Sequence, residues 1–436
     1  MAKIQTPPGM HDILPDEAVW FDYVHQVVAD IAESYGFGRI ETPALEHREL
    51  FSRGLGMATD IVEKEMYTLR TKGGDKLALR PEGTAPIVRS YIQRGMKAWP
   101  QPVKLWYFSP MFRHERQQAG RFRQFWQFGF EVLGEGDNAA DAEVIHVFSI
   151  IFKTLGLSKY SVLINSLGCN LCRPYYKKVL SGFLRTRQND LCLRCKDRMR
   201  ANPLRVLDCK EERCMRVRVD APEILDHLCD ACRAHFRGVL EFLDEIGVPY
   251  LLKPHLVRGL DYYSRTVFEF WPEEDEALPS VTQGGGALRA QSALAAGGRY
   301  DLLLKQLGAK DVGAVGGSGG VERIIAALKD TKKVEPRVAR AKVFIAQLGD
   351  KAKKQALLLF EELRKAGILT RASFGRDSIK SQLRVAEKFA VPIVLILGQK
   401  EALENSVILR TLVNGVQETV PRDKLISVLR ERLKRS

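Results

Sequence analysis

The sequence has 436 residues and a mass of 49.2 kDa, enough for two or three domains, and its 45% hydrophobic and 28% charged residues are ordinary for a globular protein. The formal net charge of +14 favours a polyanionic partner, nucleic acid more readily than a membrane, with simple solubilising charge as the alternative. Because it has neither an apolar run of about 18 residues nor a signal peptide, the chain is expected to be cytoplasmic and to span no membrane.

The first quarter of the chain is predicted to contain a helix, a short strand and a strand pair. Apolar residues recur at helical spacing from Glu17 to Tyr35, and residues 39–43 resemble an edge strand closed by a proline. Residues 60–70 and 75–80 have the pattern of paired strands.

A polar cluster, LRPEGTAP, ends the second of these strands and precedes a helix that we expect to begin near Pro86. A strand end beside a helix N-terminus is a common place for a ligand site, and Arg80, Glu82 and Thr84 lie there. The alternative is a capping arrangement with Thr84 as the N-cap, and both interpretations can hold together.

An arginine-rich hairpin is predicted between Leu105 and Glu131. Two aromatic strand-like runs, LWYFSPMF and FWQFGFE, flank a polar centre. Four arginines lie within eleven residues of it: Arg113, Arg116, Arg121 and Arg123. Since arginine grips phosphate bidentately and keeps its charge, we interpret the hairpin as a sheet surface for a phosphate-bearing ligand. A solvated hairpin tip is the alternative.

The middle of the chain is predicted to be mostly helical. Helices are expected at Asp137–Leu155 and Ala234–Ile246, with a strand at Tyr160–Ile164 between them. All eight cysteines lie between Cys169 and Cys232 in a mostly basic, helical segment. Scattered cytosolic thiols would not cluster in this way.

A second stretch with candidate functional residues is HLVRGLDYYSRTVFEFW, residues 255–271. Its aromatic and β-branched residues predict a strand pair around Gly259–Asp261. Arg258, Tyr262 and Tyr263 can face one cavity, although a tyrosine pair usually packs in a core. An arginine buried in this apolar setting would need an anion.

Two glycine-rich runs follow a loop at 275–296. AAGGRYD is predicted to be a glycine turn that opens a helix over Leu302–Leu307. GAVGGSGGVERI is predicted to enter a helix near Val321, with Arg323 in its first turn. Glycines before a helix N-terminus let a phosphate approach backbone N–H groups, but alone they are a weak signal.

The end of the chain predicts a small, basic α/β domain with a mainly parallel core. It follows a charged, proline-bearing linker at 329–342, and strands alternate with helices from Val343 onward. A basic module beside a phosphate-binding domain suggests nucleic-acid docking, although a solvated face explains any single charge equally well.

These stretches, in their order, resemble the signatures of the histidyl-tRNA synthetase family of class II aminoacyl-tRNA synthetases. GFGRIETPALEHREL resembles the dimer-interface motif 1, FRHERQQAGRFRQFWQFGFE resembles motif 2, and GGVERI resembles motif 3. VRGLDYYSRTVFEF and AAGGRYD resemble the histidine-specific signatures, and LRPEGTA also matches. The resemblance spans essentially the whole chain.

The resemblance implies an α+β fold with an antiparallel sheet core flanked by helices, a C-terminal α/β anticodon-binding domain, and a homodimer. The implied division is catalytic core 1–165, a Cys-rich insertion 166–245, catalytic core 246–328, a linker 329–342 and an anticodon-binding domain 343–436. The insertion would clamp the tRNA acceptor stem.

The implied activity is histidine–tRNA ligation, in which L-histidine is activated with ATP and Mg²⁺ and then transferred to the 3′ end of tRNA(His). The implied catalytic residues are Arg113 and Arg258, on opposite sides of the α-phosphate. The implied ATP site is Arg113, Glu115, Arg121, Phe125 and Arg323. The implied histidine pocket is Glu82, Gly83, Thr84, Gln127, Glu131, Arg258, Tyr262 and Tyr263.

Within these sites the resemblance also suggests individual contacts. Glu115, Phe125 and Arg323 would hold adenine, Arg121 the terminal phosphates, Glu82 and Thr84 the amino group, Gln127 the carboxylate, and Glu131 and Tyr263 the imidazole, with Tyr262 completing the pocket. Arg116, Gln117 and Gln118 would meet the tRNA acceptor end. His114 is a weak candidate base for the transfer step.

The sequence departs from the family pattern in the glycines before motif 3, which could loosen that strand, in the long 275–296 loop, and in its cysteines. The cysteines form four pairs: Cys169 and Cys172, Cys192 and Cys195, Cys209 and Cys214, and Cys229 and Cys232. Such spacing suits two tetrathiolate zinc sites, with reduced thiols as the alternative. Which pairs would share a metal stays open.

Two other functions compete with the ligase. One is the synthetase-like regulatory subunit of ATP phosphoribosyltransferase, which lacks the anticodon domain and degrades the histidine signature. The other is an RNA-sensing module without turnover. The intact signatures, including Arg113, Arg258 and Arg323, favour the ligase.

Overall fold

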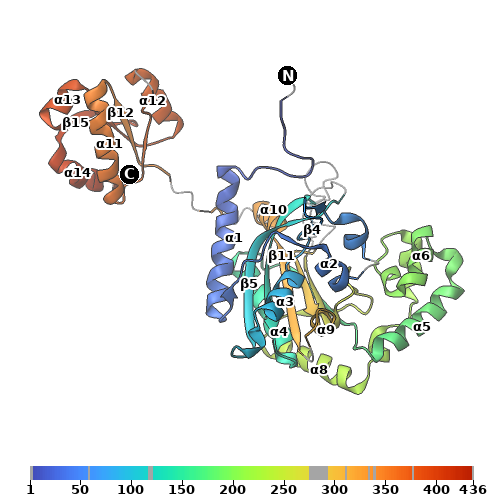
Figure 1. Ribbon diagram of the computed structural model, residues 1–436. Helices are drawn as coiled ribbons and strands as arrows, with labels where there is room; N and C mark the ends of the chain where they lie inside the picture. Colours follow the sequence, from blue (N-terminus) through green and yellow to red (C-terminus); the bar gives the residue numbers. More distant parts are fainter. Residues whose placement is uncertain are drawn as a thin grey trace. The chain divides into compact units, whose positions relative to one another are not determined.

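The computed structural model describes residues 3–56, 59–115, 121–273, 293–309, 312–331, 334–336, 340–375 and 378–434. The chain divides into two compact units, residues 1–336 and 337–436, and each has its own sheet and hydrophobic core (Figure 1). Among the described residues, no helix is long and apolar enough to cross a membrane.

The first unit is built on an eight-stranded sheet. Its strands are β1 (Gly38–Arg39), β5 (Val103–Phe112), β6 (Gln124–Leu133), β7 (Tyr160–Ser166), β8 (Tyr250–Leu252), β9 (Ser264–Pro272), β10 (Ala295–Arg299) and β11 (Ala314–Gly320). They lie in the order β1-β5-β6-β11-β10-β9-β7-β8. Only the edge pairs, β1 with β5 and β7 with β8, are parallel. The predicted antiparallel core is therefore confirmed.

The two faces of this sheet carry different kinds of side chain, because successive residues of a strand point to opposite faces. On one face Phe128, Phe130, Phe268 and Phe270 pack with Phe148 into the larger apolar core. The helices of that core are α1 (Pro15–Ser34), α4 (Asn138–Thr154), α8 (Asp230–Glu245) and α10 (Val321–Thr331). The polar residues of the same strands are thereby directed to the other face.

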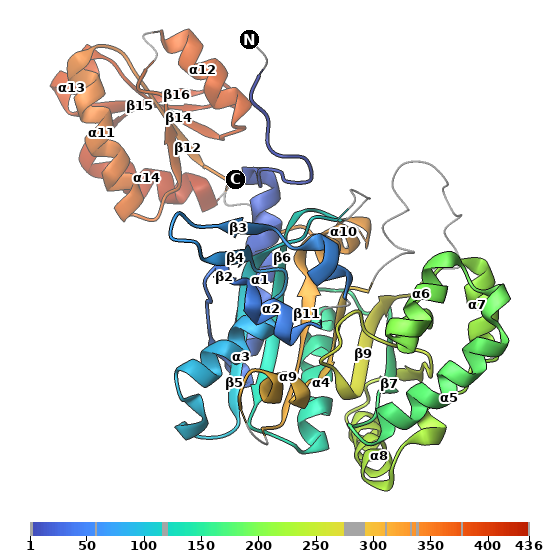
Figure 2. The ribbon, with the colours of Figure 1, turned by 45° about the vertical axis from the view of Figure 1, so that its right-hand side comes forward.

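The other face is covered in part by α2 (Arg48–Gly54), α3 (Thr84–Gln93) and α9 (Asp301–Gln306). A second, three-stranded sheet lies in this part of the chain and consists of β2 (Leu45–His47), β4 (Lys76–Leu79) and β3 (Thr68–Arg70), in that order. Figure 2 shows this small sheet and α2 together at the front of the first unit.

The cysteine-bearing segment forms a helical lobe beside the sheet, as both views show (Figures 1 and 2). Its helices are α5 (Cys172–Thr186), α6 (Leu193–Ala201) and α7 (Glu212–Val219), and it returns to the sheet through α8. The lobe has a core of its own, in which leucines pack with five buried cysteines. The prediction of a helical segment here is confirmed.

The second unit is a mixed α/β domain. Its strands are β12 (Val343–Gln347), β13 (Thr370–Ala372), β14 (Ile393–Leu397), β15 (Ser406–Thr411) and β16 (Gln417–Pro421), in the order β13-β12-β14-β15-β16. Its helices are α11 (Asp350–Lys365), α12 (Ile379–Lys388), α13 (Gln399–Glu404) and α14 (Arg422–Lys434). The first three strands are parallel and the last two antiparallel, as the sequence predicts.

Several local predictions are wrong. Residues 61–65 form a π-helical turn, and of residues 39–43 only Arg39 is in a strand. Residues 255–271 hold one strand, β9, because its partners are the distant β7 and β10 and not a neighbouring hairpin arm. The glycines of AAGGRYD lie inside strand β10 and not in a turn.

The glycines before motif 3 do not loosen their strand. β11 is paired with β6 over its whole length and with β10 from Val315 to Gly319. A Cβ on Gly316 would lie 1.8 Å from Oε2 of Glu131, and a Cβ on Gly317 would lie 2.9 Å from the Phe148 ring. Glycine is needed here because side chains of β6 and α4 occupy the space that its own side chain would take.

Candidate active site

A cavity of about 350 Å³ opens on the polar face of the main sheet. The sequence assigns thirteen residues to the ATP and histidine sites, and eleven of them line this cavity: Glu82, Thr84, Arg113, Glu115, Arg121, Phe125, Gln127, Arg258, Tyr262, Tyr263 and Arg323. They come from α3, the β5–β6 hairpin, the loop before β9, and α10. The fold therefore assembles side chains that are up to about half the chain apart in sequence.

Positive charge is concentrated at the hairpin side of the cavity. The Arg113 guanidinium lies over the Phe125 ring, 5.3 Å from its centre, and Arg113 Nε donates to the carbonyl oxygen of Pro81 at 2.8 Å. Arg121 Nη1 lies 3.1 Å from Glu115 Oε2. Burial lowers the pKa of Arg323, and repulsion from Arg121 and Arg113 lowers it further. Three clustered guanidiniums with few acidic partners form a site for a polyanion.

The N-terminus of α3 is capped by a side chain that also faces the cavity. The two carboxylate oxygens of Glu82 accept hydrogen bonds from the backbone N–H groups of Thr84 and Ala85, both at 2.8 Å. Thr84 is the first helical residue and not the N-cap, so the capping alternative proposed for it is wrong. The Tyr262 hydroxyl donates to Glu82 Oε2 at 3.4 Å, which connects the two sides of the pocket.

Glu131 and Gly83 do not line the cavity. Glu131 is fully buried beneath it, where its carboxyl group accepts hydrogen bonds from the hydroxyls of Thr84, at 2.7 Å, and Tyr300. Burial raises the pKa of Glu131 to about 8. At Gly83, a Cβ would lie 2.4 Å from the Tyr107 ring, so this position allows α3 to approach β5.

Arg258 lines the same cavity and is held by an anion that the sequence did not identify. Its Nη1 forms a short ion pair with Glu269 Oε1, and its guanidinium lies 5.5 Å from the centre of the Tyr263 ring. Trp271 Nε1 donates to the other oxygen of Glu269 at 2.8 Å. Period-two alternation could have revealed Glu269, because it stands between the core residues Phe268 and Phe270.

Two residues that line the cavity each have a buried polar atom without a partner among the described residues. These atoms are Nε of Arg258 and Oε1 of Gln127. A buried polar group without a partner is costly, so these atoms are suited to a polar ligand.

The cysteine-bearing lobe also reaches the cavity, which the sequence did not predict. Asp208 and Lys210, on either side of Cys209, both line it. Burial and the Glu269 carboxylate raise the pKa of Asp208. The backbone carbonyl oxygen of Tyr263 accepts a hydrogen bond from Arg173 Nη1 at 2.8 Å.

An arginine cluster further fastens the lobe to the core. Asp60 Oδ atoms lie 2.7 Å from Arg194, 3.2 Å from Arg198 and 3.1 Å from Arg205. Burial alone would raise the pKa of Asp60, but these three guanidiniums outweigh it and the pKa is lowered. The π-helical turn follows Asp60, and the carbonyl oxygen of Glu65 at its end accepts a hydrogen bond from the backbone N–H of His114 at 2.7 Å. His114 lies at the base of the hairpin loop.

The eight cysteines form two groups of four, which answers the question of pairing left open by the sequence. The outer cysteine cluster is Cys169, Cys172, Cys229 and Cys232, and the inner cysteine cluster is Cys192, Cys195, Cys209 and Cys214. All sulfurs within a group lie within 4.8 Å of one another. In the sequence, the four residues of the inner cluster therefore lie between the first pair and the second pair of the outer cluster.

Three further predictions concern residues at or beyond the edge of the described chain. Arg116, Gln117 and Gln118, and most of the 275–296 loop, lie outside the described residues. His114 does not line the cavity, and its ring packs 5.4 Å from that of Tyr67. This position favours a structural role for His114 over that of a base.

Comparison with known proteins gives one consistent family. The sequence model of histidyl-tRNA synthetase matches residues 9–170, and that of an anticodon binding domain matches residues 342–432. A histidine–tRNA ligase of Dehalococcoides mccartyi is 43% identical over 98% of this chain and 100% of its own length. One of Desulforamulus reducens is 41% identical over 98% and 99%. The crystal structure of apo S. aureus histidyl-tRNA synthetase matches with a TM-score of 0.77 at 31% identity, over 98% of this chain and 100% of that chain.

The raised pKa of Glu131 predicts a pH-dependent stability. The folded protein keeps this proton up to about pH 8, whereas the unfolded chain loses it near 4.5. The stabilisation is therefore complete below about pH 4.5 and is lost as the pH rises through about 8. We expect the free energy of unfolding, measured with urea in ligand-free protein between about pH 5 and pH 8, to fall more steeply for the wild type than for Glu131→Gln.

The matched control is Glu212→Gln, because the Glu212 side chain is 80% exposed. It should follow the wild-type pH dependence. Equal slopes for the wild type and Glu131→Gln would show that Glu131 does not hold this proton.

Proposed function

The chain belongs to the histidyl-tRNA synthetase family and is a histidine–tRNA ligase, and we propose that it activates histidine in the cavity between Arg113 and Arg258. The observation that carries this assignment is the convergence of these two arginines, from separate segments, on one cavity with unpartnered polar atoms. The regulatory-subunit alternative is disfavoured, because ligases match over the full length, including the second unit.

In the first step a carboxylate oxygen of histidine bonds to the α-phosphorus of ATP. The bond from that phosphorus to the bridging oxygen breaks, and pyrophosphate leaves with the electron pair. Negative charge grows on the nonbridging oxygens, so cations aimed there lower the barrier. Arg113, stacked on Phe125, and Arg258, oriented by Glu269, are proposed to supply them from two sides.

The remaining lining residues divide between the two substrates. We assign adenine to Glu115, Phe125 and Arg323, and the terminal phosphates to Arg121. Glu82 and Thr84 are assigned to the α-amino group, Gln127 to the carboxylate, and Tyr262 and Tyr263 to the imidazole. Glu131 lies below the cavity, so its proposed contribution to imidazole recognition acts through the Thr84 hydroxyl that it holds.

ATP is proposed to enter with Mg²⁺ on its β- and γ-phosphates. Glu322 lines the same cavity, and burial raises the pKa of its carboxyl group to about 7. A divalent cation beside it would favour the ionised carboxylate, which is the form that binds such ions. The ion would neutralise charge on the leaving pyrophosphate. In the second step a ribose hydroxyl at the 3′ end of tRNA(His) attacks the acyl carbon, and AMP leaves. The protein is proposed to work in the cytoplasm, with the second unit binding the anticodon.

The two cysteine clusters are proposed to be structural zinc sites. Zinc–sulfur bonds of about 2.3 Å in a tetrahedron separate the sulfurs by about 3.8 Å. The sulfurs of Cys169 lie 3.7 Å from Cys172 and 3.9 Å from Cys229, and those of Cys192 and Cys209 lie 3.9 Å apart. A disulfide of about 2.05 Å does not fit these separations. Backbone N–H groups of Cys229 and Cys192 donate to sulfurs of Cys172 and Cys214, as thiolates require.

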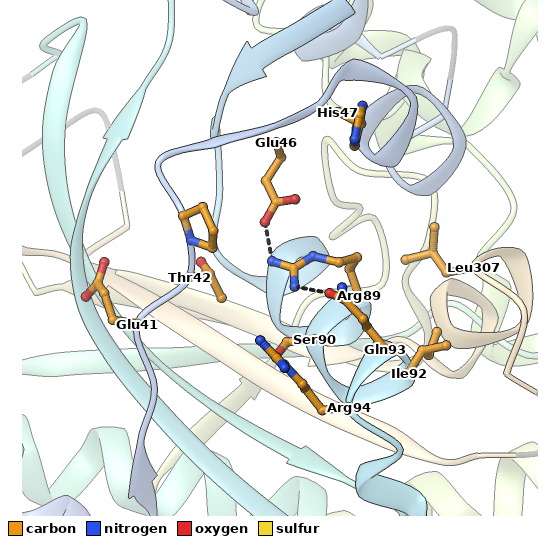
Figure 3. Close-up of a pocket in the computed structure, with 11 residues that line it drawn as sticks. Glu41, Thr42, Glu46, His47, Arg89, Ser90, Ile92, Gln93, Arg94 and Leu307 are labelled. Carbon is orange, nitrogen blue, oxygen red and sulfur yellow. Dashed lines mark hydrogen bonds and ion pairs between the residues drawn. The ribbon is translucent and has the colours of Figure 1, made fainter. Parts of the chain in front are cut away.

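A homodimer is proposed to form over the motif 1 region. Beside it lies a hollow of about 630 Å³, lined by Glu41, Glu46, His47, Arg89 and Arg94 among others. Figure 3 shows Arg89 placed between Glu46 and Gln93, to which dashed lines connect it. Leu45, which precedes Glu46 in β2, and Leu69, in β3 of the same small sheet, are 43% and 40% exposed, so this sheet leaves apolar surface for a partner.

The activation step predicts pyrophosphate–ATP exchange that depends on histidine and on no other amino acid. Arg258→Ala should slow the exchange by at least about a hundredfold, because it removes charge that is needed in the transition state. The Kd for histidine should change by less than about threefold, because its amino, carboxylate and imidazole groups are assigned to other residues.

Arg216→Met is the control for this experiment, since Arg216 is exposed and lies outside the cavity. It should exchange at the wild-type rate. A wild-type protein that is folded but shows no exchange would refute the proposed activation. A loss of histidine binding in Arg258→Ala at unchanged kcat would refute the role of Arg258.

The zinc proposal predicts about two zinc ions per chain by elemental analysis of protein prepared without chelators. Cys195→Ser should lower the content by one, because the inner cluster alone loses a ligand. Wild-type protein without zinc, or a Cys195→Ser variant with the full content, would contradict the assignment.

The dimer proposal predicts a solution mass of about twice the 49.2 kDa chain by sedimentation equilibrium at micromolar concentration. Leu45→Glu should shift the equilibrium toward monomer, because it places a charge on the apolar surface beside the hollow. A wild-type protein with the mass of a single chain would rule the dimer out.

A further inference from the structure

We propose that the inner cysteine cluster holds Lys210 in the reaction cavity, where the Lys210 ammonium binds a phosphate group of a substrate. This inference rests on the proposed function, because it adds a residue to the same cavity. It goes beyond that function by giving the cysteine-bearing lobe a direct part in substrate binding.

The first observation is one of adjacency along the chain. Cys209 is a buried member of the inner cluster, and the next residue, Lys210, lines the cavity. Only one peptide bond separates a candidate metal ligand from the cavity wall. A shift of the sulfur therefore becomes a shift of the lysine backbone.

The second observation is that this stretch has no direct hydrogen bond to the catalytic core among the described residues, although Leu207 and Cys209 are buried in the core of the lobe. Residues 207–211 lie between two helical segments and have no regular secondary structure. The backbone N–H groups of Leu207 and Cys209 donate to the carbonyl oxygens of Leu204 and Val206, both at 3.1 Å. The carbonyl oxygens of Leu207 and Glu211 accept from Arg218, at 3.0 Å, and from the N–H of Met215, at 2.9 Å. All of these partners belong to the lobe itself, and none ties the stretch to the catalytic core. Four metal–thiolate bonds would be the strongest restraint on this stretch.

The third observation concerns charge. Arg121 and Arg258, which also line the cavity, are already paired with Glu115 and Glu269. Within the described part of the chain, Lys210 makes no hydrogen bond or ion pair, and its side chain is exposed at the cavity wall. A lysine ammonium is a compact point charge with three donors, which suits a phosphate oxygen.

The lobe is attached to the core at residues near the cavity. Asn202 Nδ2 donates to Asp261 Oδ1 at 2.9 Å, and Asp261 lies beside the tyrosines of the pocket. The arginine cluster on Asp60 fastens the same lobe to the turn that supports the hairpin loop. Both attachments use residues 194–205 of the lobe, which come shortly before Lys210 in the chain.

Two substrates bring phosphate to this cavity, ATP and the 3′-terminal nucleotide of tRNA, and two assays separate them. If Lys210 binds ATP, Lys210→Met should raise the KM for ATP in pyrophosphate exchange by about tenfold, as expected for the loss of one charge-assisted hydrogen bond. If it binds the tRNA end, exchange should stay normal and single-turnover transfer from preformed adenylate should slow by about tenfold. Either result supports a phosphate contact.

The controls keep charge and folding separate. Lys210→Arg should retain most of the activity, because it preserves the positive charge. Lys178→Met removes a lysine from an exposed position of α5 that does not line the cavity, and should match the wild type in both assays. If Lys210→Met behaves like Lys178→Met in both assays, the proposed contact is wrong.

The link to the cluster is tested by a double-variant cycle in whichever assay responds. Cys195→Ser removes an inner-cluster ligand that is not adjacent to the cavity residues. We expect it to show the defect of Lys210→Met, and the double variant to be no worse than Cys195→Ser alone. Additive defects would refute the positioning role of the cluster. The phosphate contact of Lys210 is tested separately by Lys210→Met, because this variant keeps all eight thiols.

The outcomes also distinguish this inference from the proposed function. Wild-type protein without histidine-dependent exchange would contradict the function itself. An active wild-type protein together with a Lys210→Met variant that is unchanged in both assays would contradict only the inference.

Discussion

The buried carboxyl group of Glu131 is the constraint on which the geometry of the catalytic unit depends. It sits in the interior strand β6 and is satisfied by hydroxyls of Thr84 and Tyr300, which lie at the starts of α3 and α9. On the neighbouring strand β11 only glycine fits at position 316, where a Cβ would meet the carboxyl oxygen. One acidic side chain thus sets the positions of two helices and the spacing of two strands. The floor of the cavity follows from that arrangement.

Above this floor the cavity is organised by pairing cations with acids that hold them in place. Glu269 holds Arg258, and Glu115 holds Arg121. Such pairs give each guanidinium a fixed direction before a substrate arrives, which is how a site is preorganised for developing charge. Two buried polar atoms of cavity-lining residues, Oε1 of Gln127 and Nε of Arg258, have no partner among the described residues and can bind polar groups of a substrate.

Much of the fold follows from local patterns in the sequence, but contacts between distant segments do not. The hairpin of β5 and β6, helix α1 and the alternation of the second unit are visible as periodicity, because each pattern is set by burial on one face. Residues 255–271 misled the prediction, since alternation identifies a strand but not its partners. The pairing of the cysteines and the entry of Asp208 and Lys210 into the cavity depend on how a whole lobe folds back. The resemblance to a family, not periodicity, brought most of the candidate site residues together.

The most direct measurement of the central claim is a crystal structure of the protein with histidine and a non-hydrolysable ATP analogue. We expect the α-phosphate to lie between the guanidiniums of Arg113 and Arg258, with the adenine against Phe125 and the histidine ring near Tyr262 and Tyr263. An α-phosphate bound away from either arginine, or a histidine ring outside this cavity, would contradict the account.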